Sequence, residues 1–130
     1  MLDSWSGTSG FTMFDSETLE FWQKAIVLAD VIYGHTRNFP ADERFGLTNQ
    51  MRRSVVSVSS NIAEGSSRSS KTDSRRFVEI GTCSVFELVS QSFIAQRQDF
   101  LSEENFQTIY SSADEIGRML SGLRASLDRQ

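Results

Sequence analysis

The sequence predicts an all-α protein, an antiparallel up-and-down four-helix bundle, and three observations lead to this prediction. First, the 130 residues include one proline and eight glycines, too few for the frequent turns of an all-β fold. Second, four segments carry apolar residues at intervals of three and four, which is the period of one face of an α-helix. Third, most connections between these segments are short, as in a bundle. A single domain of this length can bury an ordinary hydrophobic core.

The first helix is predicted over residues 16–37. Residues 1–14 before it mix serine, glycine and threonine without a period, so we expect a loose tail followed by one bundle domain at 15–130. Asp15 or Ser16 is the expected N-cap. Aromatic residues of the tail are candidates for docking elsewhere, including on a neighbouring subunit: Trp5, Phe11 and Phe14. The apolar face of the helix is expected to comprise Leu19, Trp22, Ile26, Ala29 and Tyr33.

The second helix is expected to start after Thr48, a good N-cap, and to run to about residue 64. The connection before it, 38–47, is the longest, and Phe39-Pro40 ends the first helix because proline disfavours helical geometry at the preceding residue. Gly65 is the predicted C-terminal stop. The predicted apolar face comprises Leu47, Met51, Val55, Val58 and Ile62.

The third helix is predicted from Thr72 or Asp73 to about residue 97, and the fourth begins after Ser102 as N-cap. The third has a less regular stripe: Phe77, Ile80, Ser84, Leu88, Gln91 and Ala95, with Val78, Val85 and Val89 beside it. The fourth has a heptad-like seam that indicates left-handed bundle packing. Its members are Phe106, Ile109, Ala113, Ile116, Leu120, Leu123 and Leu127.

Bulk composition excludes some classes of protein. The net charge of −4 argues against a surface coated in positive charge for nucleic acid, although it leaves local patches open. No run of about 18 apolar residues is present, so we expect no membrane-spanning helix. The N-terminus lacks the basic and apolar regions of a secretory signal. Because Cys83 is the single cysteine, no intramolecular disulfide can form, which favours a cytoplasmic protein.

Polar side chains of the second helix share one face beside the apolar one. The members are Arg53, Ser57, Ser60, Asn61 and Glu64. One interpretation is an ordinary solvated face. The other is an interface in which serines permit close approach of helices and the remaining side chains form a hydrogen-bonded network.

The third helix favours the second interpretation, because Glu87 and Gln91 lie close to its predicted core stripe. A carboxylate there needs a partner, and Arg53 or Arg52 is the natural donor. The expected network comprises Arg53, Asn61, Glu64, Glu87 and Gln91.

The segment 52–76 is basic within an acidic protein. It contains six positive residues against two negative ones, Glu64 and Asp73. A basic stripe of this kind can bind anions or RNA. The candidate nucleic-acid-binding residues are Arg52, Arg53, Arg68, Lys71, Arg75 and Arg76.

Residues for catalysis are scarce, so the sequence predicts no enzyme, no metal site and no cofactor. His35 is the only histidine, which leaves almost no material for a Ser-His-Asp triad or for a metal site with several histidine ligands. We expect it to lie at the end of the first helix as a capping or surface residue. Cys83 is expected to be a packing residue within the third helix. No phosphate-binding glycine loop is present.

Two runs of residues carry a family resemblance. The run from Phe45 to Ser54 reads FGLTNQMRRS, and the run from Asn61 to Gly65 reads NIAEG. Together they resemble the signature of the four-helix proteins encoded in intervening sequences of bacterial 23S ribosomal RNA genes. That family is related to the accessory variability determinant protein of diversity-generating retroelements. The similarity extends over about residues 18–127, and Arg52, Arg53, Glu87 and Gln91 match its pattern.

This resemblance implies a four-helix protomer that assembles into a homopentamer. In the retroelement relative, a basic pentamer binds a reverse transcriptase and RNA. Two departures are that Ser59 stands where proline is common and that this chain is acidic overall. The sequence therefore predicts a noncatalytic oligomeric accessory protein that binds RNA or DNA, or an enzyme such as a reverse transcriptase. The alternative is a purely structural protein–protein scaffold without nucleic-acid binding.

Overall fold

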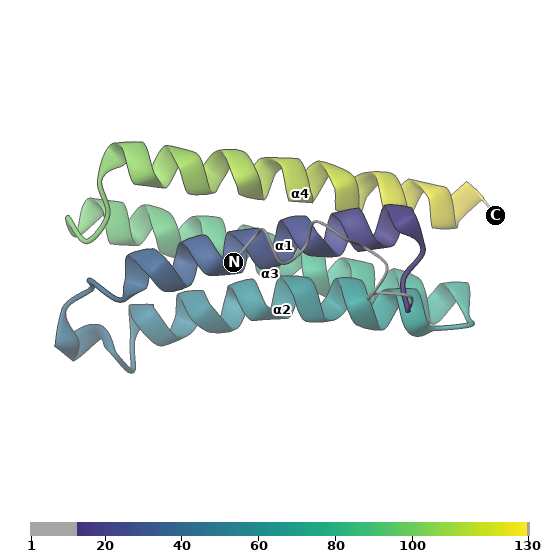
Figure 1. The fold of residues 1–130 in the computed structure, drawn as a ribbon, viewed down its shortest axis with the longest axis horizontal. Coiled ribbons are helices and arrows are strands. Elements are labelled where there is room, and N and C mark those ends of the chain that lie inside the picture. The colour runs from purple at the N-terminus through teal and green to yellow at the C-terminus, as the bar shows by residue number, and fades with distance from the viewer. Residues whose placement is uncertain (1–12, 130) are drawn as a thin grey trace.

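The computed structural model describes residues 13–129, and within that range it is all-α, as predicted. Its helices are α1 (Ser16–Thr36), the short 3-10 helix η3 (Ala41–Glu43), α2 (Leu47–Ser67), α3 (Lys71–Arg97) and α4 (Glu103–Arg129). Figure 1 shows the four α-helices lying lengthwise beside one another. Most of the predicted tail, including Trp5 and Phe11, lies outside the described residues. Phe14 does lie within them, and its ring packs on Trp22 with 5.1 Å between centroids.

Side-chain caps start three of the helices. Asp15 caps α1, because its Oδ1 accepts a hydrogen bond from the Thr18 backbone N–H at 2.8 Å. Ser102 caps α4 in the same way, accepting from Asn105 N–H at 3.0 Å. Both caps were predicted. At α3 the cap is Ser70, which accepts from Asp73 N–H at 3.2 Å, so this helix begins slightly earlier than expected.

Both predicted ends of α2 are wrong. Thr48 is a buried residue of the first turn and not the N-cap, which is Gly46. Gly46 has no side chain to cap the helix, and Glu43 provides the capping group instead. Its Oε1 accepts a hydrogen bond from Leu47 N–H at 3.1 Å. Gly65 does not stop the helix, which continues to Ser67. It instead allows α3 to approach, because a Cβ at this position would lie 3.4 Å from the Cβ of Phe77.

The core forms where the apolar faces of all four helices meet. The five predicted core residues of α2 are all buried. In α4 the predicted seam is buried from Phe106 to Leu120, whereas Leu123 is 38% exposed. The seam therefore opens over the last turns of α4, beyond the buried centre of the bundle.

The predicted faces of α1 and α3 are partly wrong, because each helix is turned about its axis relative to the expectation. In α1, Trp22, Ala29 and Tyr33 only flank the core. The buried residues are Leu19, Phe21, Ala25, Leu28, Ile32 and Thr36. In α3 the expected core residue Ile80 is 39% exposed. The buried residues there are Ser74, Val78, Gly81, Ser84, Val85, Leu88, Ser92 and Ala95.

The composition of α3 explains why its face was hard to predict. Apolar residues occur nearly all round this helix, and periodicity selects a face only when the opposite face is polar. By length and composition alone α3 is long and apolar enough to cross a membrane, and 33% of its 18-residue apolar window is buried. One such helix is weak evidence for a membrane span. The core helix of a soluble protein meets the same criterion.

Candidate functional site

Among the predicted nucleic-acid-binding residues, Arg52 joins two helices of the bundle. Its Nε donates a hydrogen bond to Thr36 Oγ1 at 2.9 Å, and its guanidinium lies over the ring of Tyr33, 4.6 Å from the centroid. A cation over an aromatic face is an attractive electrostatic contact. These contacts tie the last turns of α1 to α2 and leave less of the guanidinium for a ligand.

The other basic residues form no continuous stripe. Arg53 and Arg68 are separated by about 22 Å along α2, at 1.5 Å per residue. At the α2–α3 connection, Arg68 pairs with Glu64 at 2.8 Å and lies over the Phe77 ring.

Farther along this end of the bundle, Arg75 lies 3.7 Å from Asp128 of α4. Lys71 is the first residue of α3, and Arg76 is exposed without an ion pair to any described residue. Carboxylates therefore neutralise part of the cluster formed by Arg68, Lys71, Arg75 and Arg76.

A small polar layer joins α2 to α3. Asn61 Nδ2 donates to the Ser57 carbonyl at 2.8 Å and to Ser57 Oγ at 3.0 Å. Ser57 Oγ in turn lies 2.8 Å from Ser84 Oγ across the helix contact. Next to this layer a Cβ on Gly81 would lie 3.5 Å from Asn61 Cβ. Small side chains thus allow the two helices to pack closely, as the serine-rich face of α2 predicted.

The remaining members of the predicted network do not meet within the described part of the chain. Glu64 pairs with Arg68, and Arg53 and Glu87 are exposed without an ion pair to a described residue. Gln91 has a buried Oε1 that no described group contacts by a hydrogen bond. Glu87 points away from the core because Val85 and Leu88 occupy it. A network between separate copies of the chain stays a prediction.

The sequence reasoning missed an apolar surface on α3, which we call the outer face of α3. It comprises Ile80, Cys83, Phe86, Phe93 and Ile94. Phe86 is 72% exposed and Phe93 is 49% exposed. Cys83 is exposed as well, not packed as expected. The signal was present in the sequence, because only one charged residue, Glu87, occurs between Ile80 and Ile94.

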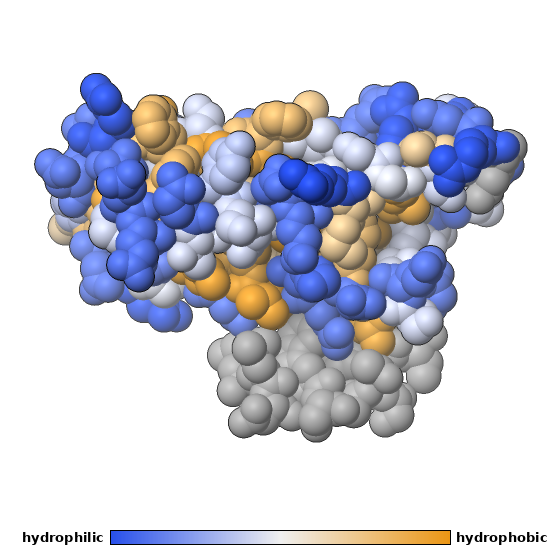
Figure 2. All heavy atoms as spheres, turned by 90° about the horizontal axis from the view of Figure 1, so that it is seen from above, coloured by the Kyte–Doolittle hydropathy of each residue, from blue (hydrophilic) through white to orange (hydrophobic). Residues whose placement is uncertain are grey.

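The apolar surface continues onto α4. The ring of Phe106 lies 5.4 Å from that of Phe93 and 6.0 Å from that of Tyr110, which is itself 46% exposed. Beside them is a groove of about 450 Å³ between α3 and α4, with Phe86, Val89 and Gly117 in its lining. Figure 2 views the molecule from above the view of Figure 1 and shows hydrophobic residues exposed among hydrophilic ones. Contiguous exposed apolar surface of this kind marks interaction sites.

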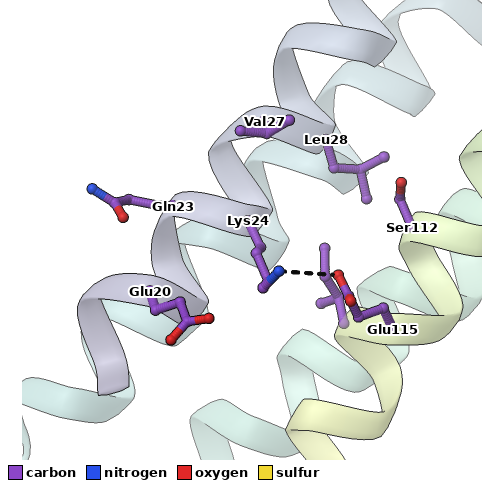
Figure 3. Close-up of a pocket in the computed structure, with 8 residues that line it drawn as sticks. Glu20, Gln23, Lys24, Val27, Leu28, Ser112 and Glu115 are labelled. Atoms are coloured by element: carbon purple, nitrogen blue, oxygen red, sulfur yellow. Dashed lines mark ion pairs between the residues drawn. The ribbon is translucent and has the colours of Figure 1, made fainter. Parts of the chain in front are cut away.

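Another groove, of about 410 Å³, lies between α1 and α4. Figure 3 shows Lys24 pointing across it to Glu115, and the Nζ–Oε1 distance is 3.4 Å. Both partners are partly exposed, so this ion pair contributes little to stability. Gln23 points away from the pair. The lining contains no nucleophile paired with a base, and the groove therefore offers no recognisable catalytic arrangement.

Metal-binding groups are also absent from residues 13–129, since no three His, Cys, Asp or Glu side chains there are grouped to hold an ion. His35 lies in the last turn of α1, as predicted. The features that stand out on the described surface are exposed apolar area and charge.

Comparison with known proteins identifies the family. The model of the 23S rRNA-intervening sequence protein family matches residues 17–122. The chain belongs to this family. The matched range covers all of α2 and α3, and so includes both signature runs and the outer face of α3.

A solved structure has the same fold as this member of the 23S rRNA-intervening sequence family. It is a protein of unknown function from the S23 ribosomal protein family of Bacteroides thetaiotaomicron. The TM-score is 0.77 at 19% sequence identity, over 83% of this chain and 97% of the other. At that identity the likeness concerns the fold alone. A search of curated proteins found no match.

Proposed function

We propose that this chain is the noncatalytic protomer of a homo-oligomer, an antiparallel up-and-down bundle that works by binding macromolecules. The observation that carries the proposal is the outer face of α3. Four of its side chains, Ile80, Phe86, Phe93 and Ile94, are between 39% and 72% exposed in the single chain. Burying such side chains is worth about 25 cal/mol per Å² of apolar surface removed from water, so a protein partner would be favoured.

The family resemblance supports a homopentamer as the assembly, and the single cysteine, Cys83, supports the cytoplasm as its location. The amount of exposed apolar surface on α3 fits an oligomer, because apolar and aromatic side chains are enriched at the centres of protein interfaces. An oligomer of this type would act as a scaffold or accessory factor. It needs no cofactor or metal.

Exchange of two phenylalanines tests this function. In the double variant Phe86→Gln with Phe93→Gln, the outer face becomes polar while the buried residues stay unchanged. We expect the mass measured by light scattering to fall from a multiple of the protomer to the 14.7 kDa of one chain. Phe45→Gln is the matched control, because Phe45 is 85% exposed but lies before α2. An unchanged mass in the double variant would contradict the proposal.

Nucleic-acid binding is the second candidate function, and the basic cluster at the α2–α3 connection supports it. Arg68, Lys71, Arg75 and Arg76 lie within nine residues of sequence around that connection. Against it, Glu64 and Asp128 pair with two of the arginines. If this surface binds RNA, or holds RNA for an enzyme such as a reverse transcriptase, the affinity must fall steeply with salt.

Binding of a fluorescent RNA hairpin, measured by anisotropy over a range of salt concentrations, tests this second function. In the triple variant Arg68→Glu, Arg75→Glu, Arg76→Glu we expect weaker binding at every salt concentration. The log–log salt slope should become shallower by roughly 0.7–0.9 for each phosphate that the variant no longer neutralises. The control for net charge is a second triple reversal at exposed arginines outside the cluster, Arg37→Glu, Arg44→Glu and Arg97→Glu, which changes the net charge by the same amount. Wild-type affinity and slope in the triple variant would exclude RNA binding by this cluster.

A further inference from the structure

The outer face of α3 is long and carries a single charge. From Ile80 to Ile94 it extends about 21 Å along the helix, at 1.5 Å per residue. Glu87 is the one charged residue in that stretch of sequence. A partner that covers the apolar side chains must also cover or closely approach this carboxylate. Removing a carboxylate from water is unfavourable unless a cation pairs with it.

A suitable cation lies on α2 of the same sequence. Arg53 is exposed and makes no ion pair with a described residue. The neighbouring Val56 is 43% exposed, so apolar surface is available on α2 next to Arg53. Arg53 and Val56 also share a shallow depression with Asn49 and Tyr33. This surface complements the outer face of α3 in both respects, because it offers apolar area and the opposite charge.

Within one chain, Arg53 and Glu87 lie near each other in register but do not pair. The contacts from Gly65 to Phe77 and from Ser57 to Ser84 show that facing residue numbers fall on α2 as they rise on α3. Extending this register by one turn places Arg53 level with Glu87. Both side chains nevertheless remain exposed and form no ion pair with each other. Each is therefore available to a second molecule.

We propose that a second copy of this chain covers the outer face of α3, and that Glu87 of one copy pairs with Arg53 of the other. This inference rests on the proposed self-association and specifies its contacts. A guanidinium can meet a carboxylate through two parallel hydrogen bonds, which also fixes the orientation of the two copies. The pair supplies specificity, whereas Phe86 and Phe93 supply the buried area.

Mixing two charge-reversed variants tests the pairing. Arg53→Glu and Glu87→Arg each bring like charges together at the contact, so each alone should weaken self-association by about tenfold or more. In an equimolar mixture the opposite charges meet again across every contact between unlike copies. A closed ring of five keeps one contact between like copies, so we expect light scattering to show species larger than the protomer in the mixture, and not the complete ring, at a concentration where neither variant assembles alone. The double variant should assemble as well.

Matched control variants distinguish the pairing of Glu87 with Arg53 from self-association in general. Asp30→Arg in α1 and Arg37→Glu at its C-cap make the same charge changes at exposed positions and should leave assembly unchanged. Circular dichroism melting checks that every variant is folded, and Arg53→Gln and Glu87→Gln provide neutral variants if a reversal unfolds the chain.

Rescue by the double variant, together with a mixture that stays at the mass of one protomer, would place the pair within one copy and overturn the inference. Full assembly of each reversal alone would also overturn it. In either case self-association that is lost in the Phe86→Gln, Phe93→Gln variant would leave the proposed function intact. A wild-type chain that stays monomeric would contradict both the proposed self-association and the pairing of Glu87 with Arg53.

Discussion

Leu88→Ala is expected to lower the free energy of unfolding by about 2–5 kcal/mol, the largest loss among the substitutions considered. Leu88 is fully buried, at 0% exposure, on the side of α3 that faces the core. Truncation removes apolar contacts and leaves a cavity that the four packed helices can close only in part. Chemical denaturation at one fixed protein concentration measures the loss, since assembly would otherwise shift the apparent stability.

Leu123→Ala is the matched control for this prediction. It makes the same chemical change at a position that is 38% exposed near the end of α4. We expect it to cost less than half as much as Leu88→Ala, because less apolar surface is returned to water. Equal losses at the two positions would mean that the core does not centre on Leu88.

Gly81 is expected to respond in opposite directions to a small and a large side chain. A Cβ there would meet Asn61 Cβ at 3.5 Å and Leu120 Cδ2 at 3.6 Å, which are ordinary contact distances. Gly81→Ala should therefore stabilise the helix by up to about 1 kcal/mol. Gly81→Leu must push α2 or α4 away, and overpacking of this kind costs about 1–3 kcal/mol.

Thermal and urea unfolding of both variants, again at fixed concentration, measure these changes. Gly34→Leu on α1 is the control, since a Cβ at Gly34 meets nothing within 4 Å. Its effect should be neutral or stabilising. If Gly81→Leu were as stable as Gly81→Ala, the close approach of α2, α3 and α4 at this point would be wrong.

The sequence determined the fold class and the buried faces of two helices. In α2 and α4 the polar and apolar residues lie on opposite sides, so spacing alone identified Met51, Val58, Ile109 and Ile116 as core residues. The N-caps Asp15 and Ser102 were also predictable, because capping depends on local sequence. The start of α2 was not, since Glu43 from the preceding turn accepts the hydrogen bond.

The faces of α1 and α3 depended on tertiary packing that periodicity could not resolve. The predicted stripe of α3 contained both Ile80 and Leu88, and of these only Leu88 is buried. The core instead takes in Val78 and Val85, which were predicted to lie beside the stripe. This choice turned Glu87 and Phe86 outward. The predicted network around Glu87 therefore does not form within the described chain, and an apolar surface that the sequence reasoning had missed is exposed instead.

The candidate site depends on this same rotation of α3. Charge counting found the basic residues but not their partners, because Arg68 pairs with Glu64 in α2 and Arg75 pairs with Asp128 from the far end of the chain. Contacts between α3 and the C-terminal end of α4 cannot be inferred from composition. Of the two candidate functions, self-association and nucleic-acid binding, the fold therefore favours self-association.

The mass of the wild-type chain in solution, measured by light scattering over a range of concentrations, tests the central claim most directly. We expect a discrete multiple of the 14.7 kDa protomer, with a pentamer as the specific expectation from the family resemblance. A mass of 14.7 kDa at every concentration would contradict self-association through the outer face of α3.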